Sequence, residues 1–180
     1  FSFVQEIEGL DFYESLKLLA DRAGIEITFE GTAKKDEKDT LRKIHKSAAG
    51  FYVDVLLKNI KMLEYLHGRG LTDETIKEFS LGAAQKAWQD LYNHLSKDGF
   101  TDNTVLASGL VIERKKEGQD KRFMYDRFRD RIMFPLYDIS GNIIAFSGRA
   151  FDEGGSDPTS AKYINSPQTS LYDKSSILYP

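Results

Sequence analysis

Three arginines occupy every second position in the segment that follows Tyr125. If this segment forms a strand, Arg127, Arg129 and Arg131 point to one face, because alternate residues of a strand share a face. Guanidinium groups bind phosphate oxygens through paired hydrogen bonds and keep their charge, so such a row suits a nucleic-acid backbone. A strand edge protected by charge is an equally good interpretation of the spacing alone.

A fourth arginine, Arg149, ends the apolar stretch that follows the first three. It comes directly after Ser147 and Gly148, whose small side chains allow another chain to approach closely. We expect Arg149 to lie beside the three earlier arginines and to bind the same series of phosphates.

Further candidate binding residues follow an irregular loop: Lys162, Tyr163, Asn165, Ser166 and Lys174. Tyr163 can stack on an unpaired base, and Lys162 can neutralise a phosphate. Asn165 and Ser166 either offer hydrogen bonds to a ligand or only shape a turn. Lys174 lies in a predicted loop, where a lone lysine is usually only solvated.

Other site chemistries find little support in the sequence. The chain has no cysteine, so neither a disulfide nor a thiolate metal site can form. His45, His67 and His94 are far apart, and we expect each to be a surface or half-buried helical residue rather than a ligand. No glycine-rich nucleotide-binding signature occurs. Asp126 and Asp130 flank the arginines, and we expect them to neutralise these neighbours.

Positive charge is concentrated in one part of the chain. The 180 residues carry a formal charge of −3, yet residues 121–150 have six basic and three acidic side chains. A basic stripe on an acidic body can hold nucleic acid with weak, salt-sensitive affinity. The length predicts one or two small domains, and no apolar run approaches the ~20 residues that span a bilayer.

Hydrophobic periodicity predicts helices over the first hundred residues. One helix begins near Asp11 and ends at Gly24, and the charged residues 31–39 are predicted to form a flexible linker. A long amphipathic helix follows from Asp39. Its inward positions are Leu41, Ile44, Ala48, Tyr52 and Val55.

Four shorter helices complete the helical half. The first includes residues 62–66, and Thr72 caps the second, with Ile76 and Phe79 directed inward. Residues 101–106 form the last. The third, between them, presents a stripe that we assign to the core: Trp88, Leu91, Tyr92 and Leu95.

After Gly109 the period changes to that of strands. Residues 110–114 and 122–125 form one predicted hairpin with a charged turn, and residues 132–137 and 143–146 form a second around the turn 138–142. Strands joined this closely are antiparallel. Helices followed by strands indicate an α+β fold, with a helical N-terminal half followed by a mainly antiparallel sheet.

Linked motifs along the chain carry a family resemblance. The sequence has DRFRDRIMFP at residues 126–135, DISGNIIAFSGR at 138–149, KYINSPQT at 162–169 and KSSILY at 174–179. YLHGRGLTDETIKEFSLGAA at residues 65–84 and the segment 1–27 add to the series. In this order and spacing they resemble the N-terminal part of the RNA polymerase (catalytic core) domain of DnaG-type bacterial DNA primases.

The resemblance implies an activity, partners and site residues. It implies a nucleotidyltransferase of the primosome that makes short RNA primers on single-stranded DNA in the bacterial cytoplasm. The partners would be template, ribonucleotides, the RNA–DNA hybrid and, through regions outside this chain, the replicative helicase. Positions that match the family's template- and nucleotide-binding residues are Arg127, Arg129, Arg131, Arg149, Lys162, Tyr163 and Lys174, and we add Asn165.

The resemblance also places the catalytic metal outside this chain. Magnesium-binding carboxylates are expected in a Toprim fold after residue 180, and zinc in an upstream domain, so we expect no metal and no catalytic residue here. Residues 1–30 then correspond to the tail of the zinc domain, 31–39 to the linker, and 40–180 to the N-terminal subdomain of the catalytic core. We expect this chain alone to make no primers.

Two other interpretations remain open from the sequence. One is a non-catalytic single-stranded-DNA-binding module of a plasmid or phage replication protein, and the other is an interaction domain that binds no nucleic acid. Three departures from the family pattern bear on this choice. Glu78 stands where Lys or Arg is common, Ala84–Gln85 where an aromatic or Ala-Pro pair is common, and Pro180 where Gly is usual.

Overall fold

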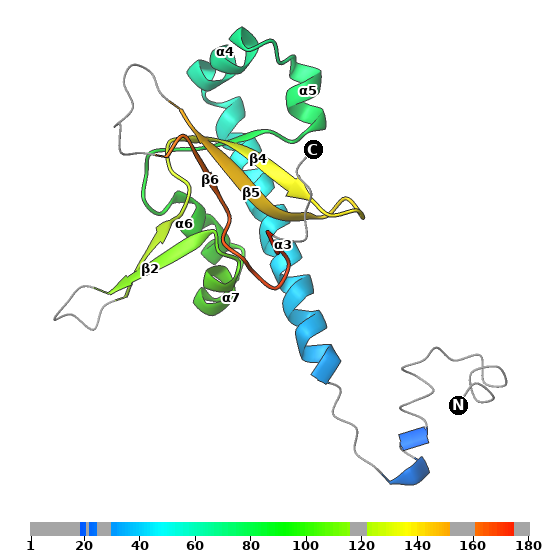
Figure 1. Cartoon of the computed structure of the whole chain (residues 1–180). Helices are drawn as coiled ribbons and strands as arrows, with labels where there is room; N and C mark the ends of the chain where they lie inside the picture. The colour runs from blue at the N-terminus through cyan, green and yellow to red at the C-terminus, as the bar shows by residue number, and fades with distance from the viewer. Residues whose placement is uncertain (1–18, 21, 25–29, 116–121, 152–160, 175–180) are drawn as a thin grey trace. The chain divides into compact units, whose positions relative to one another are not determined.

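Helices precede strands along most of the chain, which confirms the predicted α+β order (Figure 1). The structure, a computed structural model, describes residues 19–20, 22–24, 30–115, 122–151 and 161–174. Residues 1–36 and 37–180 form two compact units. Most of the helix predicted from Asp11 lies outside the described residues, but Gly24 at its predicted end has a left-handed φ of +68°.

The long helix α3, Glu30–Leu57, extends further than predicted. Its inward positions are buried as expected: Leu41, Ile44, Ala48, Tyr52 and Val55. The expected irregular backbone at residues 31–39 is wrong, because this segment is the first part of α3. Its Ala, Lys and Glu residues have high helix propensity, so a charged run without apolar periodicity is also the pattern of an exposed helical end. The assignment of these residues to domains stays a prediction.

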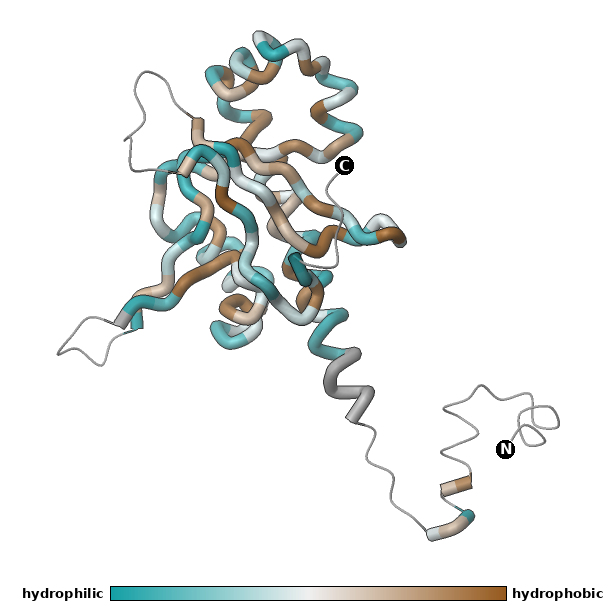
Figure 2. Tube along the Cα trace, viewed as in Figure 1, coloured by the Kyte–Doolittle hydropathy of each residue, from teal (hydrophilic) through white to brown (hydrophobic). Residues whose placement is uncertain are grey.

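Four short helices follow: α4 Ile60–Gly68, α5 Asp73–Glu78, α6 Asp90–Lys97 and α7 Asp102–Ala107. Thr72 caps α5, as predicted, by accepting a hydrogen bond from the Thr75 N–H. The inward assignment of Phe79 is wrong, because α5 ends at Glu78 and Phe79 is 54% exposed beyond it. In Figure 2 apolar and polar residues alternate along α4 and α5, which is the hydropathy pattern of helices with one buried face.

The main sheet has four strands in the order β1-β4-β5-β6. Its strands are β1 Gly82–Ala84, β4 Arg131–Tyr137, β5 Ile143–Ala150 and β6 Tyr163–Asn165, and each neighbouring pair is antiparallel. The predicted β4–β5 hairpin is confirmed. The sequence did not reveal β1 and β6, because three residues are too few to show a periodicity.

Helix α3 packs across this sheet. A side-chain carbon at Gly82 would lie 2.5 Å from Cβ of Tyr52, so only glycine lets β1 approach the helix this closely. Tyr52 and His45 of α3 both contact the Phe146 ring of β5, at centroid distances of 5.4 and 5.9 Å. His45 is fully buried, not surface or half-buried as expected, and burial lowers its pKa. It is therefore a neutral core residue.

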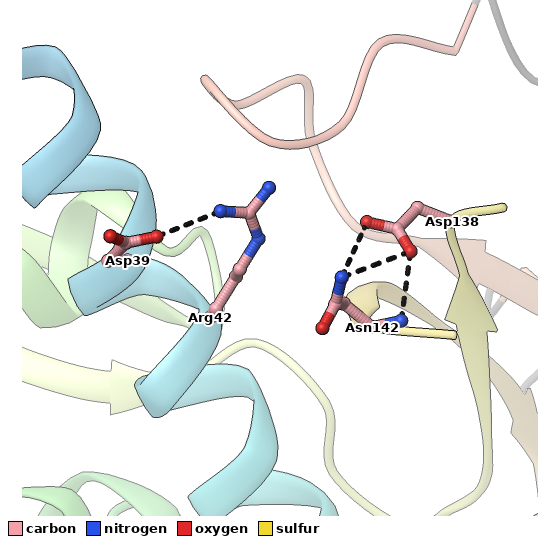
Figure 3. A network of polar contacts seen from close by, with 4 residues as sticks. All are labelled: Asp39, Arg42, Asp138 and Asn142. Atoms are coloured by element: carbon pink, nitrogen blue, oxygen red, sulfur yellow. Dashed lines mark hydrogen bonds and ion pairs between the residues drawn. The ribbon is translucent and has the colours of Figure 1, made fainter. Parts of the chain in front are cut away.

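The turn between β4 and β5 is fixed by Asp138. Its carboxylate accepts hydrogen bonds from the backbone N–H groups of Ser140 and Asn142, both at 2.9 Å, and from the Asn142 side chain. These bonds, those of Asn142 above all, hold the Asp138 pKa below its usual range. Figure 3 shows Arg42 of α3, bonded to Asp39, facing this turn, where its charge also lowers the Asp138 pKa.

A second, two-stranded sheet consists of β2 Val111–Lys115 and β3 Arg122–Asp126. The two strands are antiparallel, which confirms the first predicted hairpin. Most of the charged turn predicted between them lies outside the described residues. On β3 the side chains of Met124 and Asp126 are buried, while that of Phe123, the residue before Met124, is exposed. This alternation is that of a strand with one inner face and one outer face.

Candidate nucleic-acid interface

Four basic side chains line one pocket of about 510 Å³. Three segments far apart in the sequence form it: the connection from β1 to α6, the connection from β3 to β4 with the first residue of β4, and β6. The lining residues are Lys86, Trp88, Arg127, Arg129, Asp130, Arg131 and Ile164. We call this the arginine pocket.

The three alternating arginines do not lie on one strand, so that part of the sequence prediction is wrong. β3 ends at Asp126 and β4 begins at Arg131, which leaves Arg127 and Arg129 in the connection. The N–H groups of Asp126 and Asp130 donate to the Trp88 and Gln85 carbonyls, and Asp130 has a left-handed φ of +53°. The chain turns here, and the guanidinium groups gather around a pocket instead of forming a row.

Arg127 and Arg131 are held by backbone carbonyls. Arg127 Nε donates to Gly109, and Arg131 donates through Nη1 to Gly148 at 3.0 Å and through Nη2 to Ala161 at 3.1 Å. Burial lowers the pKa of both arginines, and the nearby positive charge of Arg129 lowers that of Arg131 further. A guanidinium stays protonated in proteins, so both are charges fixed in place.

Gly148 makes room for this arrangement. A side-chain carbon at position 148 would lie 2.7 Å from the Phe128 ring and 3.0 Å from Cδ of Arg131. The arginine stem therefore crosses β5 over a glycine. The sequence suggested that the small residues before Arg149 let another chain segment approach closely, and in this structure the side chains that approach Gly148 are those of Phe128 and Arg131.

Arg129 is arranged differently, because it is stacked on aromatic rings. Its guanidinium carbon lies 4.1 Å from the centre of the Trp88 ring and 5.4 Å from that of Tyr125. Nη1 donates to the Asp126 carbonyl at 2.7 Å. A guanidinium stacked by its face keeps donors along its edge, which suits a phosphate in the pocket.

Asp126 caps helix α6, a role that the sequence did not predict, and its charge also interacts with that of Arg129, one of the neighbours it was expected to neutralise. Its buried carboxylate accepts hydrogen bonds from the N–H groups of Leu91 at 2.9 Å and Tyr92 at 3.0 Å. Gln89, the residue before the helix, makes no side-chain cap. Burial raises the pKa of Asp126 to about 6, although both hydrogen bonds and the charge of Arg129 act in the opposite direction.

Arg149 lies outside the arginine pocket. It pairs in register with Ile132 on β4 and Tyr163 on β6, whereas Arg131 pairs with Ala150. Its guanidinium carbon lies 5.2 Å from the Tyr65 ring centre and 5.9 Å from that of Tyr163. Its Nε is buried and has no hydrogen-bond partner within the described residues. Arg69 also lies over the Tyr65 ring, with its guanidinium carbon 5.3 Å from the ring centre. We call Arg149, Tyr65, Tyr163 and Arg69 the Arg149 cluster.

The remaining predicted residues are not brought into either group. Lys162 and Lys174 are exposed, and Asn165 is half-buried on β6. Ser166 is buried, and its hydroxyl accepts from the Phe146 N–H, which continues the pairing of β5 and β6. Ser166 thus has a structural role, in strand pairing rather than in the turn that the sequence suggested.

Sequence reasoning missed Lys86 and Trp88. Trp88 was assigned to the core through its spacing from Leu91 and Leu95, both buried. It lies before the first residue of α6 and is 55% exposed, so the helical period does not include it. The acidic residue Asp90, directly before Leu91, was the available sequence signal that the helix begins there and not at Trp88.

One other polar cluster resembles a catalytic arrangement but has the wrong hydrogen-bond direction. The Ser47 hydroxyl donates to the Asp98 carboxylate and lies 3.0 Å from Nε2 of His94. The hydroxyl proton therefore points to Asp98, and His94 is not placed to remove it as a catalytic base would. Within the described ranges, no group of three or more acidic or His side chains is placed to hold a metal ion, and no helix is long and apolar enough to cross a membrane.

Comparison with known proteins decides the family. Residues 51–180 match the family model of the N-terminal domain of the DNA primase catalytic core. The chain belongs to this family. It is also 39% identical over 181 residues to a DNA primase of Deinococcus radiodurans, an alignment that covers 99% of this chain and 29% of that relative.

Two solved primase structures share the fold of this primase-core domain. One is the RNA polymerase domain of Mycobacterium tuberculosis primase DnaG in complex with a double-stranded DNA oligomer with a 6-nucleotide overhang. It is 29% identical with a TM-score of 0.66 over 76% of this chain and 41% of that one. The other is a DnaG primase catalytic domain bound to single-stranded DNA, 29% identical with a TM-score of 0.62 over 77% and 41%.

Proposed function

We propose that this chain is the part of a primase core that holds single-stranded template DNA and nucleotide phosphates while short RNA primers are made. The observation that supports the proposal most directly is the arginine pocket. Three guanidinium groups and an ammonium group surround a space of about 510 Å³, and a single carboxylate, that of Asp130, shares the lining.

Phosphate would relieve the electrostatic cost of this pocket. Burial and then the charge of Arg129 lower the pKa of Arg131, and the charge of Asp130 offsets part of this effect. Arg131 and Arg129 are both fixed by hydrogen bonds or stacking, so they cannot separate. An anion between them replaces repulsion by two attractive contacts, and charge-assisted hydrogen bonds to phosphate oxygens are strong.

The Arg149 cluster supports a second phosphate contact within the same proposal. Arg149 is clamped by two aromatic rings, and within the described residues no acceptor satisfies its Nε. A phosphate oxygen is a suitable acceptor for it. Tyr163 of this cluster is available to stack on a base, and Lys162, Asn165 and Lys174 stay proposed contacts with the template or nucleotides outside both groups.

A salt titration with single-stranded DNA tests the proposal. We expect the affinity of the chain to fall as salt rises, and Arg129→Ala to lower the slope of log affinity against log salt by about 0.7, the value for one lost phosphate contact. Lys97→Ala, an exposed lysine of α6 that does not line the pocket, is the control and should leave the slope unchanged. An unchanged slope for Arg129→Ala would contradict the proposed contact.

The chemistry of primer synthesis is proposed for the longer protein. This chain covers 29% of the length of the Deinococcus radiodurans DNA primase. Nucleotide polymerisation uses metal-bound carboxylates to stabilise the attacking and leaving oxygens. We propose that magnesium is held outside this chain and that zinc belongs to an upstream domain. The helicase partner and the cytoplasmic location of the bacterial replication machinery belong to the same proposal.

Primer synthesis by the isolated chain is the matching negative test. We expect residues 1–180, with ribonucleotides, magnesium and a single-stranded template, to give no template-dependent RNA product. The full-length protein under the same conditions should give primers. RNA product from the chain alone would contradict the proposal that the catalytic metal site lies outside this chain. No product from the full-length protein would favour a non-catalytic single-strand-binding module.

A further inference from the structure

Three aromatic rings lead away from the arginine pocket along β3. Trp88, which lines the pocket, contacts Tyr125 edge to face with ring centres 5.7 Å apart. Tyr125 in turn lies next to Phe123, with centres 6.3 Å apart and an angle of 21° between the ring planes. The three rings form a continuous series, which we call the aromatic row.

The aromatic row is on the outer face of its sheet. Phe123 and Tyr125 alternate with Met124 and Asp126, which are both buried, so the two rings point away from the core. Phe123 is 46% exposed, and Trp88, as noted above, more so. Large rings are usually buried for most of their surface, and a connected group of them in contact with water is typical of a binding surface.

Arginines lie at both ends of the row. Arg129 covers the Trp88 ring at the pocket end. At the other end, Arg114 of β2 is the register partner of Phe123, so the two side chains share the outer face. Arg114 is exposed. The surface therefore combines π faces with flanking positive charge, which complements a ligand that is both planar-ringed and anionic.

We propose that the aromatic row is a platform on which successive unpaired bases of a single nucleic-acid strand stack, while the arginine pocket holds the backbone of the same strand. The inference rests on the proposed function, because the pocket supplies the phosphate contact. It adds a base-binding site, made by Phe123, Tyr125 and Trp88, along which the bound nucleic-acid strand continues from the arginine pocket over β3. Stacking accepts any base, because every base has a π face.

The two parts of this surface contribute different forces. Phosphate binding releases counterions and depends steeply on salt, whereas stacking depends on the presence of a base. Removing a ring should therefore lower affinity without changing the salt slope. Removing Arg129 should change the slope. The salt slope therefore distinguishes base stacking on the aromatic row from phosphate binding in the arginine pocket.

The chain offers a direct optical probe, since Trp88 is its single tryptophan. We would titrate the protein with a single-stranded oligothymidylate and with an abasic oligonucleotide of equal length and charge, following tryptophan fluorescence and anisotropy. We expect the base-bearing strand to quench Trp88 and to bind at least about five-fold more tightly for each base stacked. The abasic strand should bind weakly with the same salt slope and no quenching.

Substitution identifies the platform residue by residue. Phe123→Leu should lower the affinity for oligothymidylate towards that for the abasic strand and leave the salt slope unchanged. The matched control is Tyr137→Leu, a partly exposed aromatic at the opposite end of β4 from Arg131, which should bind as the wild type does. Circular dichroism melting checks that both variants fold.

Equal affinity of the two oligonucleotides, or equal behaviour of Phe123→Leu and Tyr137→Leu, overturns the platform. In either case salt-dependent binding that is sensitive to Arg129 would leave the proposed function standing. If neither oligonucleotide binds in a salt-dependent way, the proposed function fails with it.

Discussion

Arg131 and Arg149 lie on neighbouring hydrogen-bonded strands and point to opposite faces of the same sheet. Ile132 pairs with Arg149 while Arg131 pairs with Ala150. Paired residues share a face and neighbouring residues alternate, so the register differs by one residue between the two arginines. Their partners agree, since Arg131 lines the arginine pocket with Ile164, and Arg149 contacts Tyr163, the residue that precedes Ile164 on β6. The expectation that Arg149 lies beside the three earlier arginines is therefore wrong, and the arginines form two separate groups.

Two separate groups predict additive effects on binding. Arg129→Ala and Arg149→Ala should each weaken single-stranded DNA binding, and the double variant should show the sum of the two losses within about 0.5 kcal/mol. The measurement is a double-mutant cycle from binding titrations at one salt concentration. A coupling energy well above 1 kcal/mol would show that the two arginines act on the same phosphate.

Arg131 and Arg129 should differ in their effects on stability. Arg131 is buried and donates to the Gly148 and Ala161 carbonyls, of which only the bond to Gly148 is buried, so Arg131→Ala should cost about 1–3 kcal/mol of unfolding free energy. Arg129→Ala loses one carbonyl bond and a stacking contact and should cost about 1 kcal/mol or less. Urea denaturation of both variants measures the difference, and equal costs would contradict it.

Gly148→Ala should destabilise the sheet although it adds only one methyl group. The new carbon would lie 2.7 Å from the Phe128 ring, which is itself buried, and overpacking of this kind costs about 1–3 kcal/mol. Gly68→Ala is the control, because a side-chain carbon there meets nothing within 4 Å. We expect a lower melting temperature for Gly148→Ala alone, and also weaker DNA binding if Arg131 moves.

Asp126 predicts a fall in stability as pH rises through the acid range. Its folded pKa of about 6 lies above its ordinary value of 3.8, so the folded state binds the proton more tightly than the unfolded chain. Between these two values unfolding releases a proton, and the unfolding free energy decreases with rising pH, by at most about 3 kcal/mol.

Asp126→Asn should remove this pH dependence. At neutral pH the variant should also lose about 1 kcal/mol, because the amide can accept from only one of the Leu91 and Tyr92 N–H groups. Denaturation midpoints from pH 4 to pH 7 for both proteins give the comparison. A wild-type curve that rises over this range would contradict the sign.

Local pattern was enough for most elements of the fold. The inward positions of α3 and the two hairpins follow from periods of 3.6 and 2 that extend over many residues. The strand predicted through Arg127 and Arg129 failed because its period was extended across Asp130. There the backbone bonds to Gln85, a residue 45 positions earlier that no local pattern indicates.

The candidate site could be predicted in part for the same reason. Residue chemistry identified the arginines and Tyr163, but their orientation depends on register between strands that include β6, which has only three residues. Trp88 was misplaced because the helix boundary at Asp90 depends on a capping carboxylate from β3. Long-range hydrogen bonds thus determined what the periodicity could not.

The cap that Asp126 provides has a consequence for synthesis on the ribosome. Helix α6 emerges first, and the carboxylate that satisfies its leading N–H groups follows 35 residues after Leu91. At roughly 5–20 residues per second, this leaves the helix start solvated for on the order of seconds. A nascent chain that stops before β3 therefore has the leucines of α6 without the partner that fixes its first turn, and completion of the helical half waits for the strands.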